Sequence, residues 1–124
     1  MQYVGVDIVE IERIRKVIER WGETFLTRVF TPAELTHYRN KYSSLAARLA
    51  AKEAVLKSLN GCGRGISWQD IEVLSENNGK PVVNLFGKAK QAADELSIAE
   101  LAVTLSHSDN YAVAFAVGAT TPVH

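Results

Sequence analysis

The sequence LAARLAAKEAVLKSLNG, residues 45–61, predicts a long central helix around which the rest of the chain is organised. Alanine and leucine favour helices, Ser43 and Ser44 are suitable N-cap residues, and Asn60 followed by Gly61 is a typical helix end. At about 100° per residue, the leucines form one narrow stripe and the alanines cover most of the opposite side. A helix that is apolar on nearly all sides is a buried helix, so we expect it to lie in the core.

Four charged residues interrupt the apolar surface of this helix: Arg48, Lys52, Glu53 and Lys57. Burying a charge costs free energy unless the charge is paired or coordinated. Glu53 and Lys57 are one turn apart and allow an ion pair on a solvated face, worth about 0.2–0.5 kcal/mol. Arg48 lies across the leucine stripe from them, and Lys52 falls within the stripe. The helix alone therefore leaves two interpretations open, a solvated charged face and a functional site.

The composition is that of one folded domain covering residues 1–124, with residues 119–124 expected to fray. Of the 124 residues, 47% are hydrophobic and 23% are charged, which is enough apolar material for a core. The 14 basic and 14 acidic residues cancel, which argues against nucleic-acid binding driven by net charge. A single cysteine, Cys62, excludes a disulfide framework within the chain. Without a signal peptide or an apolar run of about 20 residues, we expect a cytoplasmic protein that does not cross a membrane.

The remaining segments alternate between helical and strand patterns. Residues 3–9 read as a short buried strand, and Thr31, Pro32 and Glu34 form the capping box that begins a helix ending near Arg39. Helices are further expected at 9–21, 23–30 and 87–96, and strands at 68–74, 82–86, 99–106 and 111–118, with a turn at 77–79, a hairpin turn at 107–110 and a glycine-rich loop at 61–65. This order predicts an α+β fold, with a largely antiparallel sheet packed on the central helix.

Two carboxylates stand in apolar surroundings, Asp7 within the first strand and Glu53 within the central helix. Two such groups repel each other unless a proton or cation lies between them, and a site with room for water and phosphate oxygens suits Mg²⁺. The alternative is an Asp that caps the first helix and a Glu in a surface ion pair. Arg48, Lys52 and Lys57 are suited to binding phosphates, and His107 is either a phosphate ligand or base, or simply a solvated turn residue.

The motifs together resemble the holo-[acyl-carrier-protein] synthases, the small 4′-phosphopantetheinyl transferases. The blocks that carry the resemblance occur in the family's order and spacing: VGVDI (4–8), followed by Glu10 and Arg13, FTPAEL (30–35), RLAAKEAVLK (48–57), WQDIEV (68–73), NGKP (78–81) and LSHS (105–108). The first block alone is weakly specific, but its combination with AAKEAxxK at this separation is strongly specific. The similarity covers residues 2–117, nearly the whole chain, and implies one copy of the transferase fold.

The resemblance implies a reaction and a set of site residues. Such enzymes move the 4′-phosphopantetheine arm of coenzyme A onto a serine of apo acyl carrier protein, in support of fatty acid biosynthesis, and release adenosine 3′,5′-bisphosphate. Asp7 and Glu53 match the Mg²⁺ ligands, and Glu53 and Lys57 the catalytic positions. The positions that match coenzyme A-binding residues are Arg48, Lys57, Gly79, Lys80, Pro81, Ser106 and His107. Family members of this length are homotrimers with active sites between subunits.

The basic N-terminal helices are the expected docking surface for an acidic carrier protein. We assign to this surface Arg13, Ile14, Val17, Trp21, Phe25 and Arg28; an ordinary solvated helix face is the alternative. The serine needs a base, and the sequence leaves Glu53 and a metal-bound hydroxide equally open. Two further function classes stay open, a module that binds coenzyme A or carrier protein without chemistry, and a purely structural trimerisation domain. Asp7, Glu53, Lys57 and His107 all favour the enzyme.

Overall fold

The computed structural model describes residues 1–60 and 65–120. Its elements, in chain order, are β1 (Gln2–Glu10), α1 (Ile11–Trp21), α2 (Glu23–Val29), α3 (Pro32–Tyr38), α4 (Tyr42–Ser58), a short 3₁₀ helix (Trp68–Asp70), β2 (Ile71–Ser75), β3 (Pro81–Leu85), α5 (Gly87–Glu95), β4 (Ile98–His107) and β5 (Tyr111–Thr120). All strand pairs are antiparallel, in one sheet of order β1-β5-β4 and a second of β2 and β3. The predicted α+β class is confirmed, with two sheets in place of one.

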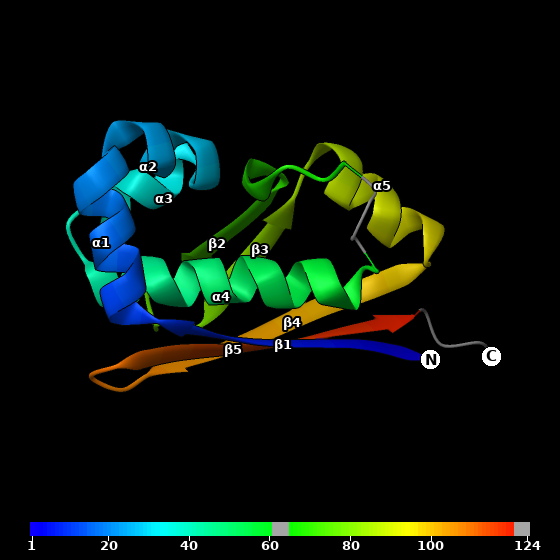
Figure 1. Cartoon of the computed structure of the whole chain (residues 1–124). Coiled ribbons are helices and arrows are strands. Elements are labelled where there is room, and N and C mark those ends of the chain that lie inside the picture. The colour runs from blue at the N-terminus through cyan, green and yellow to red at the C-terminus, as the bar shows by residue number, and fades with distance from the viewer. Residues whose placement is uncertain (61–64, 121–124) are drawn as a thin grey trace.

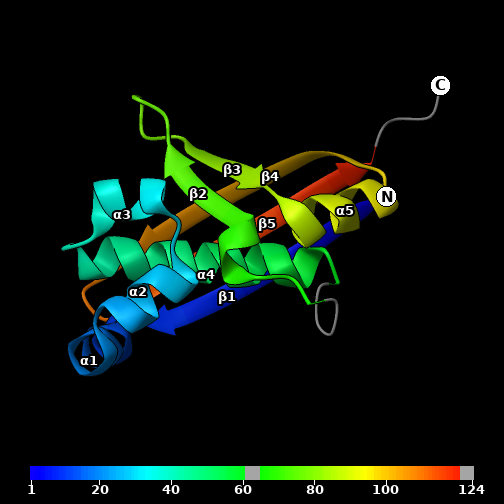
Figure 2. The same cartoon turned by 90° about the horizontal axis from the view of Figure 1, so that it is seen from above.

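The central helix α4 lies between the two sheets (Figure 1). The three-stranded sheet covers one side of it, while β2, β3 and the smaller helices lie on the other (Figures 1 and 2). Helices α1, α2 and α3 gather at the end where α4 begins, and α5 lies toward the opposite end (Figure 1). Every element that carries a candidate site residue therefore lies beside α4 or at one of its ends.

The burial predicted for α4 is confirmed, but its start is not where the sequence placed it. Its five central alanines are completely buried: Ala46, Ala47, Ala50, Ala51 and Ala54. The helix begins at Tyr42 after the N-cap residue Lys41, which makes no side-chain cap, so Ser43 and Ser44 lie inside the first turn. At the other end Asn60 has a φ of 52°, the left-handed conformation typical of a helix terminus.

Strand β1 packs directly against the backbone of α4 because Gly5 has no side chain. A Cβ at this position would overlap the carbonyl oxygen of Ala54 and approach the Ser58 nitrogen to 2.9 Å. Only alternate residues of β1 face the helix, whereas Val4, Val6 and Ile8 point to the other side and are 52%, 47% and 62% exposed. The prediction of a buried strand is thus wrong for its outer face.

The structure also tests three local predictions, on the start of α3, on residues 68–70 and on the end of β5. The capping box of Thr31 and Glu34 is confirmed, with both hydrogen bonds formed. Residues 68–70 form a 3₁₀ helix instead of the predicted strand, because Ser67 and Asp70 make a capping box of their own. Ala119 and Thr120, expected to fray, are the last residues of β5.

Parts of the predicted features lie outside the described residues. These are residues 61–64 of the glycine-rich loop, including Cys62, and residues 121–124 of the tail. Among the helices that the structure describes, none is both long enough and apolar enough to cross a membrane.

Candidate functional site

Asp7, Glu53 and Lys57 come together where β1 packs against α4. The Lys57 Nζ donates to Asp7 Oδ1 at 3.0 Å and to the backbone oxygen of Val6 at 3.1 Å. Asp7 keeps only 13% of its side-chain surface exposed, whereas the Lys57 side chain is 51% exposed. Gly5 explains this proximity, because it permits β1 to approach α4 closely. Asp7, two residues after Gly5 in the same strand, then lies alongside the helix.

The pKa of Glu53 is raised above its ordinary value, first because burial disfavours its charged form. The charge of Asp7 and a hydrogen bond with it raise this pKa further, and the positive charge of Lys57 partly opposes the shift. Two neighbouring carboxylates repel each other, and a divalent cation bound between them would relieve this repulsion. Within residues 1–60 and 65–120 no group of three or more His, Cys, Asp or Glu side chains is arranged so that it could hold a metal ion by itself. A two-carboxylate donor set suits Mg²⁺, which keeps several non-protein oxygen ligands.

The two carboxylates line a pocket of about 450 Å³ at the junction of β1, α1 and α4. Ile14 and Leu49 are among its apolar lining residues, and Glu10, Arg13 and Tyr111 also contribute to its wall. Arg13 thereby connects this pocket with the basic face of α1. Glu10, Leu49 and Tyr111 were not predicted as site residues. Leu49 lies one turn before Glu53 in α4, so helix spacing could have indicated it, whereas only the fold brings Tyr111 of β5 to this pocket.

Lys52, the neighbour of Glu53 in α4, is completely buried and forms an ion pair with Glu34 at 2.8 Å. Its Nζ also donates to the backbone oxygens of Trp68 at 3.1 Å and of Ile71. Burial lowers the pKa of Lys52, and Glu34 opposes this shift. Lys52 therefore takes part in the core and not in phosphate binding. Sequence reasoning missed the partner, although a charge within a leucine stripe signals that one must exist.

Arg48 is buried on another side of α4, near the hairpin that joins β2 and β3. Its guanidinium donates to the hydroxyls of Tyr38 and Ser75, both at 2.8 Å, and lies 3.9 Å from the centre of the Tyr38 ring. Its Nε, also buried, has no hydrogen-bond partner among residues 1–60 and 65–120. Ser75 pairs with Pro81 across the hairpin, so the structure brings Arg48 close to the turn formed by residues 79–81.

Ser106 and His107 lie at the end of β4, on opposite faces of the three-stranded sheet. In the register of this sheet His107 is opposite Ala112, which is opposite Val9. His107 therefore lies two strands away from β1, about 10 Å at the usual strand spacing. Within one chain the predicted residues thus form three separate groups, at β1 and α4, at the β2–β3 turn, and at the end of β4.

The expected docking surface is formed only in part. Val17, Trp21, Phe25 and Arg28 line one pocket of about 370 Å³ between α1 and α2. Arg13 and Ile14 do not line this pocket. Arg13 lines the pocket of Asp7 and Glu53, and Ile14 is 5% exposed and packs against Ala46 and Ala47 of α4 and Ala112 of β5. Ile14 is therefore a core residue and not an exposed docking anchor.

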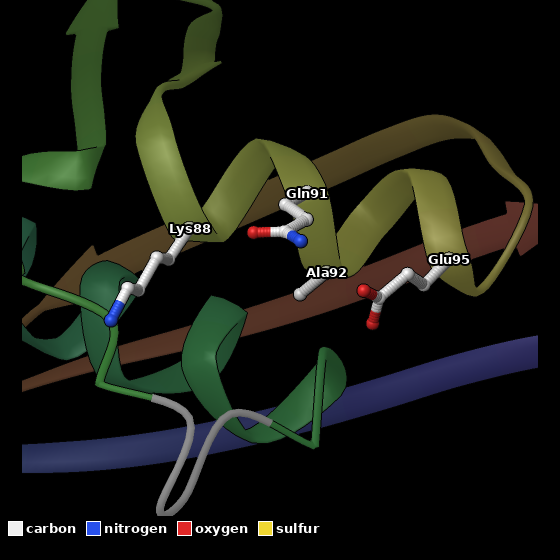
Figure 3. Close-up of a pocket in the computed structure, with 4 residues that line it drawn as sticks. All are labelled: Lys88, Gln91, Ala92 and Glu95. Atoms are coloured by element: carbon white, nitrogen blue, oxygen red, sulfur yellow. The ribbon is translucent and has the colours of Figure 1, made fainter.

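A further pocket of about 250 Å³ lies beside α5 and contains none of the predicted site residues. Figure 3 shows its lining residues Lys88, Gln91, Ala92 and Glu95, all of them on one side of that helix. Asp7, Glu53 and Lys57, the residues for which the sequence predicts chemistry, lie elsewhere, on β1 and α4.

Comparison with known proteins identifies the family. Residues 3–116 match the family described as ACPS, the 4′-phosphopantetheinyl transferase superfamily. The chain belongs to this family. It is 49% identical over 117 residues to the holo-[acyl-carrier-protein] synthase of Dehalococcoides mccartyi strain CBDB1, which covers 94% of this chain and 98% of that protein. The resemblance stated from the sequence motifs is thereby confirmed.

Solved structures of relatives share the fold. The holo-[acyl-carrier-protein] synthase of Helicobacter pylori in complex with coenzyme A is 33% identical, has a TM-score of 0.84 and covers 94% of this chain and 99% of its own. The holo-ACP-synthase of Plasmodium yoelii is 31% identical, has a TM-score of 0.85, and covers 97% and 95% of the two chains. The fold of these relatives therefore covers at least 94% of this chain.

Proposed function

We propose that this protein is a Mg²⁺-dependent holo-[acyl-carrier-protein] synthase with its catalytic centre at Asp7, Glu53 and Lys57. It transfers 4′-phosphopantetheine from coenzyme A to a serine of apo acyl carrier protein and releases adenosine 3′,5′-bisphosphate. The observation that carries the proposal is the meeting of two carboxylates and a lysine in one pocket, where burial and mutual repulsion raise the pKa of Glu53. Membership of the family supports the substrate class.

Asp7 and Glu53 would hold Mg²⁺, and the chain's own residues prepare the site for it. When bound, the ion supplies Lewis-acid stabilisation of charge on the pyrophosphate oxygens. The Asp7 side chain is oriented by its hydrogen bond from Lys57. The partly exposed Lys57 ammonium is placed to bind a phosphate oxygen and to stabilise the negative charge that grows as the serine oxygen attacks. Either Glu53 or a water molecule takes the serine proton.

Coenzyme A has candidate contacts in the other two groups of residues. A relative is described in complex with coenzyme A, which supports this ligand for the present chain. Arg48 and the turn at Gly79, Lys80 and Pro81 are suited to the phosphate and adenine ends of the molecule. Ser106 and His107 are exposed at the end of β4 and offer further hydrogen-bond groups.

The separation of these groups supports a site shared between subunits of a homotrimer. The outer face of the three-stranded sheet is apolar and uncovered, with Val6 of β1 directly opposite Phe115 of β5 and Ile8 opposite Val113. A contiguous apolar face of this kind is typical of a protein–protein interface. A trimer built on this face would cover it, and would allow β4 or the β2–β3 turn of one subunit to approach Asp7 and Glu53 of the next.

The acyl carrier protein docks on α1 and α2 in this proposal. Trp21 is 56% exposed, and together with Val17, Phe25 and Arg28 it offers an apolar pocket with a positive rim. Arg15 is occupied by Glu12 and Glu19. Arg13 lines the catalytic pocket, so a serine presented by the docked protein has a short path to Glu53.

The cytoplasmic location stays a prediction from the sequence.

The decisive experiment is the intact mass of an apo acyl carrier protein after incubation with this protein, coenzyme A and Mg²⁺. We expect a gain of one phosphopantetheine arm, which EDTA prevents and which restored Mg²⁺ recovers. No gain with any of several carrier proteins, together with retained binding of coenzyme A, would replace this function with that of a binding module. A gain that persists in EDTA would remove the metal from the proposal.

A further inference from the structure

We propose that Glu34 and Lys52 form a positioning pair that holds α4 in the rotation at which Glu53 faces Asp7. The pair touches neither substrate nor metal in this account. It acts through Glu53, and removing it weakens metal binding at the catalytic pocket. This inference rests on the proposed function, because it assigns a task to residues behind the same site.

All three N–H donors of Lys52 have a partner in the core. The Nζ pairs with Glu34 Oε1 at 2.8 Å, and it also donates to the backbone oxygens of Trp68 and Ile71. The side chain has no exposed surface. A buried ammonium with these three acceptors has one favourable position, since any shift leaves a buried charge or a carbonyl group unsatisfied.

Glu34 is held in place by backbone hydrogen bonds from two other parts of the chain. Its Oε1 accepts from the backbone nitrogen of Thr31 at 2.9 Å, within the capping box of α3. Its Oε2 accepts from the backbone nitrogen of Val73 in β2 at 2.8 Å. The carboxylate thereby joins the start of α3 and the strand β2, and the ion pair attaches α4 to both.

The consequence for the site follows from helix geometry. Lys52 and Glu53 are consecutive, so their side chains leave α4 about 100° apart. Fixing the direction of Lys52 therefore also fixes the direction of Glu53. A slip of one residue would move Lys52 by about 1.5 Å along the axis and turn it by the same angle, out of reach of its acceptors. On another side of α4, Gly5 sets the distance to β1 but carries no side chain that could fix rotation.

Apolar contacts alone would not fix the rotation of α4 as closely as this ion pair does. The neighbouring surface of α4 is largely alanine, which packs closely but offers few features that resist rotation. Hydrogen bonds are directional, and buried polar groups can specify a unique arrangement even where they add little stability. The pair is therefore expected to matter more for the geometry of the site than for the free energy of unfolding.

The test uses the double variant Glu34→Gln/Lys52→Met, which removes both charges and keeps an acceptor for the capping box. Its affinity for Mn²⁺ alone is measured by electron paramagnetic resonance, and transfer is measured as kcat and as the KM for carrier protein. We expect Mn²⁺ binding weakened at least fivefold and a lower kcat, with the KM for carrier protein unchanged. The control is Leu101→Ala on β4, compared with the double variant under conditions where both have lost the same thermal stability. This control is expected to keep the Mn²⁺ affinity of the wild type.

A folded double variant with the Mn²⁺ affinity and kcat of the wild type would overturn the inference. If the double variant does not fold, the single variant Glu34→Gln, which keeps the cap and removes one charge, decides the question. It is expected to bind Mn²⁺ more weakly, and wild-type affinity would equally reject the positioning role. Failure of the proposed function itself is distinguishable, because the wild type would then neither bind Mn²⁺ nor transfer the arm.

Discussion

At the scale of single residues, the site depends on charges that the fold forces together. Glu53 is partly buried and close to Asp7, while Lys57 compensates only part of their repulsion. This arrangement costs stability when the site holds no cation, and is characteristic of a site selected for binding instead of for packing. Glu53 is therefore the residue at which function and stability are expected to oppose each other.

The variant Glu53→Gln tests this opposition by thermal unfolding. Because the pKa of Glu53 is raised above 4.5 in the folded protein, its carboxyl contributes stability at low pH that is lost as the pH rises through the raised value. In EDTA at pH 8 the variant should therefore unfold at the same or a higher temperature than the wild type. Transfer should fall at least about a hundredfold, since a metal ligand is removed.

The same variant should lose the response to metal. With coenzyme A present, Mg²⁺ should raise the unfolding temperature of the wild type but not that of Glu53→Gln. Glu100→Gln on β4, a change at an exposed carboxylate, is the control and should respond as the wild type does. Equal stabilisation of Glu53→Gln by Mg²⁺ would show that the ion binds elsewhere.

At the scale of elements, the contact between β1 and α4 creates the site. Gly5 permits the two backbones to touch, and Asp7 reaches α4 only because of that contact. On the opposite side, β2 and α3 are tied to the helix through Lys52 and Glu34. Helix α4 is thus fixed between two elements that are distant in the sequence.

Gly5→Ala should separate these elements. The added methyl group overlaps the backbone of Ala54, and a rigid backbone cannot yield as a side chain would, so we expect a loss of about 3 kcal/mol in the free energy of unfolding. Gly118→Ala is the matched control, because there the atoms nearest to the new Cβ belong to the side chain of Ile98, with Cδ1 at 3.0 Å, and not to a backbone. Chemical denaturation measures both, and equal losses in the two variants would contradict the role given to Gly5.

The elements also show what the sequence could and could not predict. Local patterns were sufficient to predict the helices and the hairpin of β4 and β5: apolar periodicity for most of them, and the capping box for α3. The N-cap of α4 was misplaced, because the helix begins at Tyr42 without a side-chain cap and Ser43 and Ser44 lie within its first turn. Residues 68–70 alternate like a strand, yet the local bond between Ser67 and Asp70 prevails. The pair of Lys52 and Glu34 was missed because it joins different elements, which no local pattern reveals.

At the scale of the whole molecule, the structure of one chain leaves an apolar sheet face without a cover. The sequence led to the expectation that β1 is buried, and a partner subunit on this face would reconcile that expectation with the exposed Val6 and Ile8. The residues proposed for coenzyme A are likewise divided among distant parts of the chain. Assembly would solve both problems at once.

Phe115→Lys tests the assembly. If the protein forms the proposed homotrimer, a charge at the centre of the apolar face, beside Val6, should convert it to a folded monomer with little transfer activity. Phe86→Lys is the control, because Phe86 is 49% exposed, similar to the 45% of Phe115, but lies next to α5 and away from the sheet face. Light scattering after size-exclusion chromatography gives the masses. A Phe115→Lys variant that keeps the mass of the wild type would exclude this face as the interface.

A crystal grown with coenzyme A and Mn²⁺ would test most directly whether Asp7 and Glu53 form the metal site. The anomalous difference map should show a peak between these two carboxylates, in contact with the pyrophosphate and close to Lys57. A peak at another place, or bound coenzyme A with no metal beside Asp7 and Glu53, would exclude a metal site at these two residues.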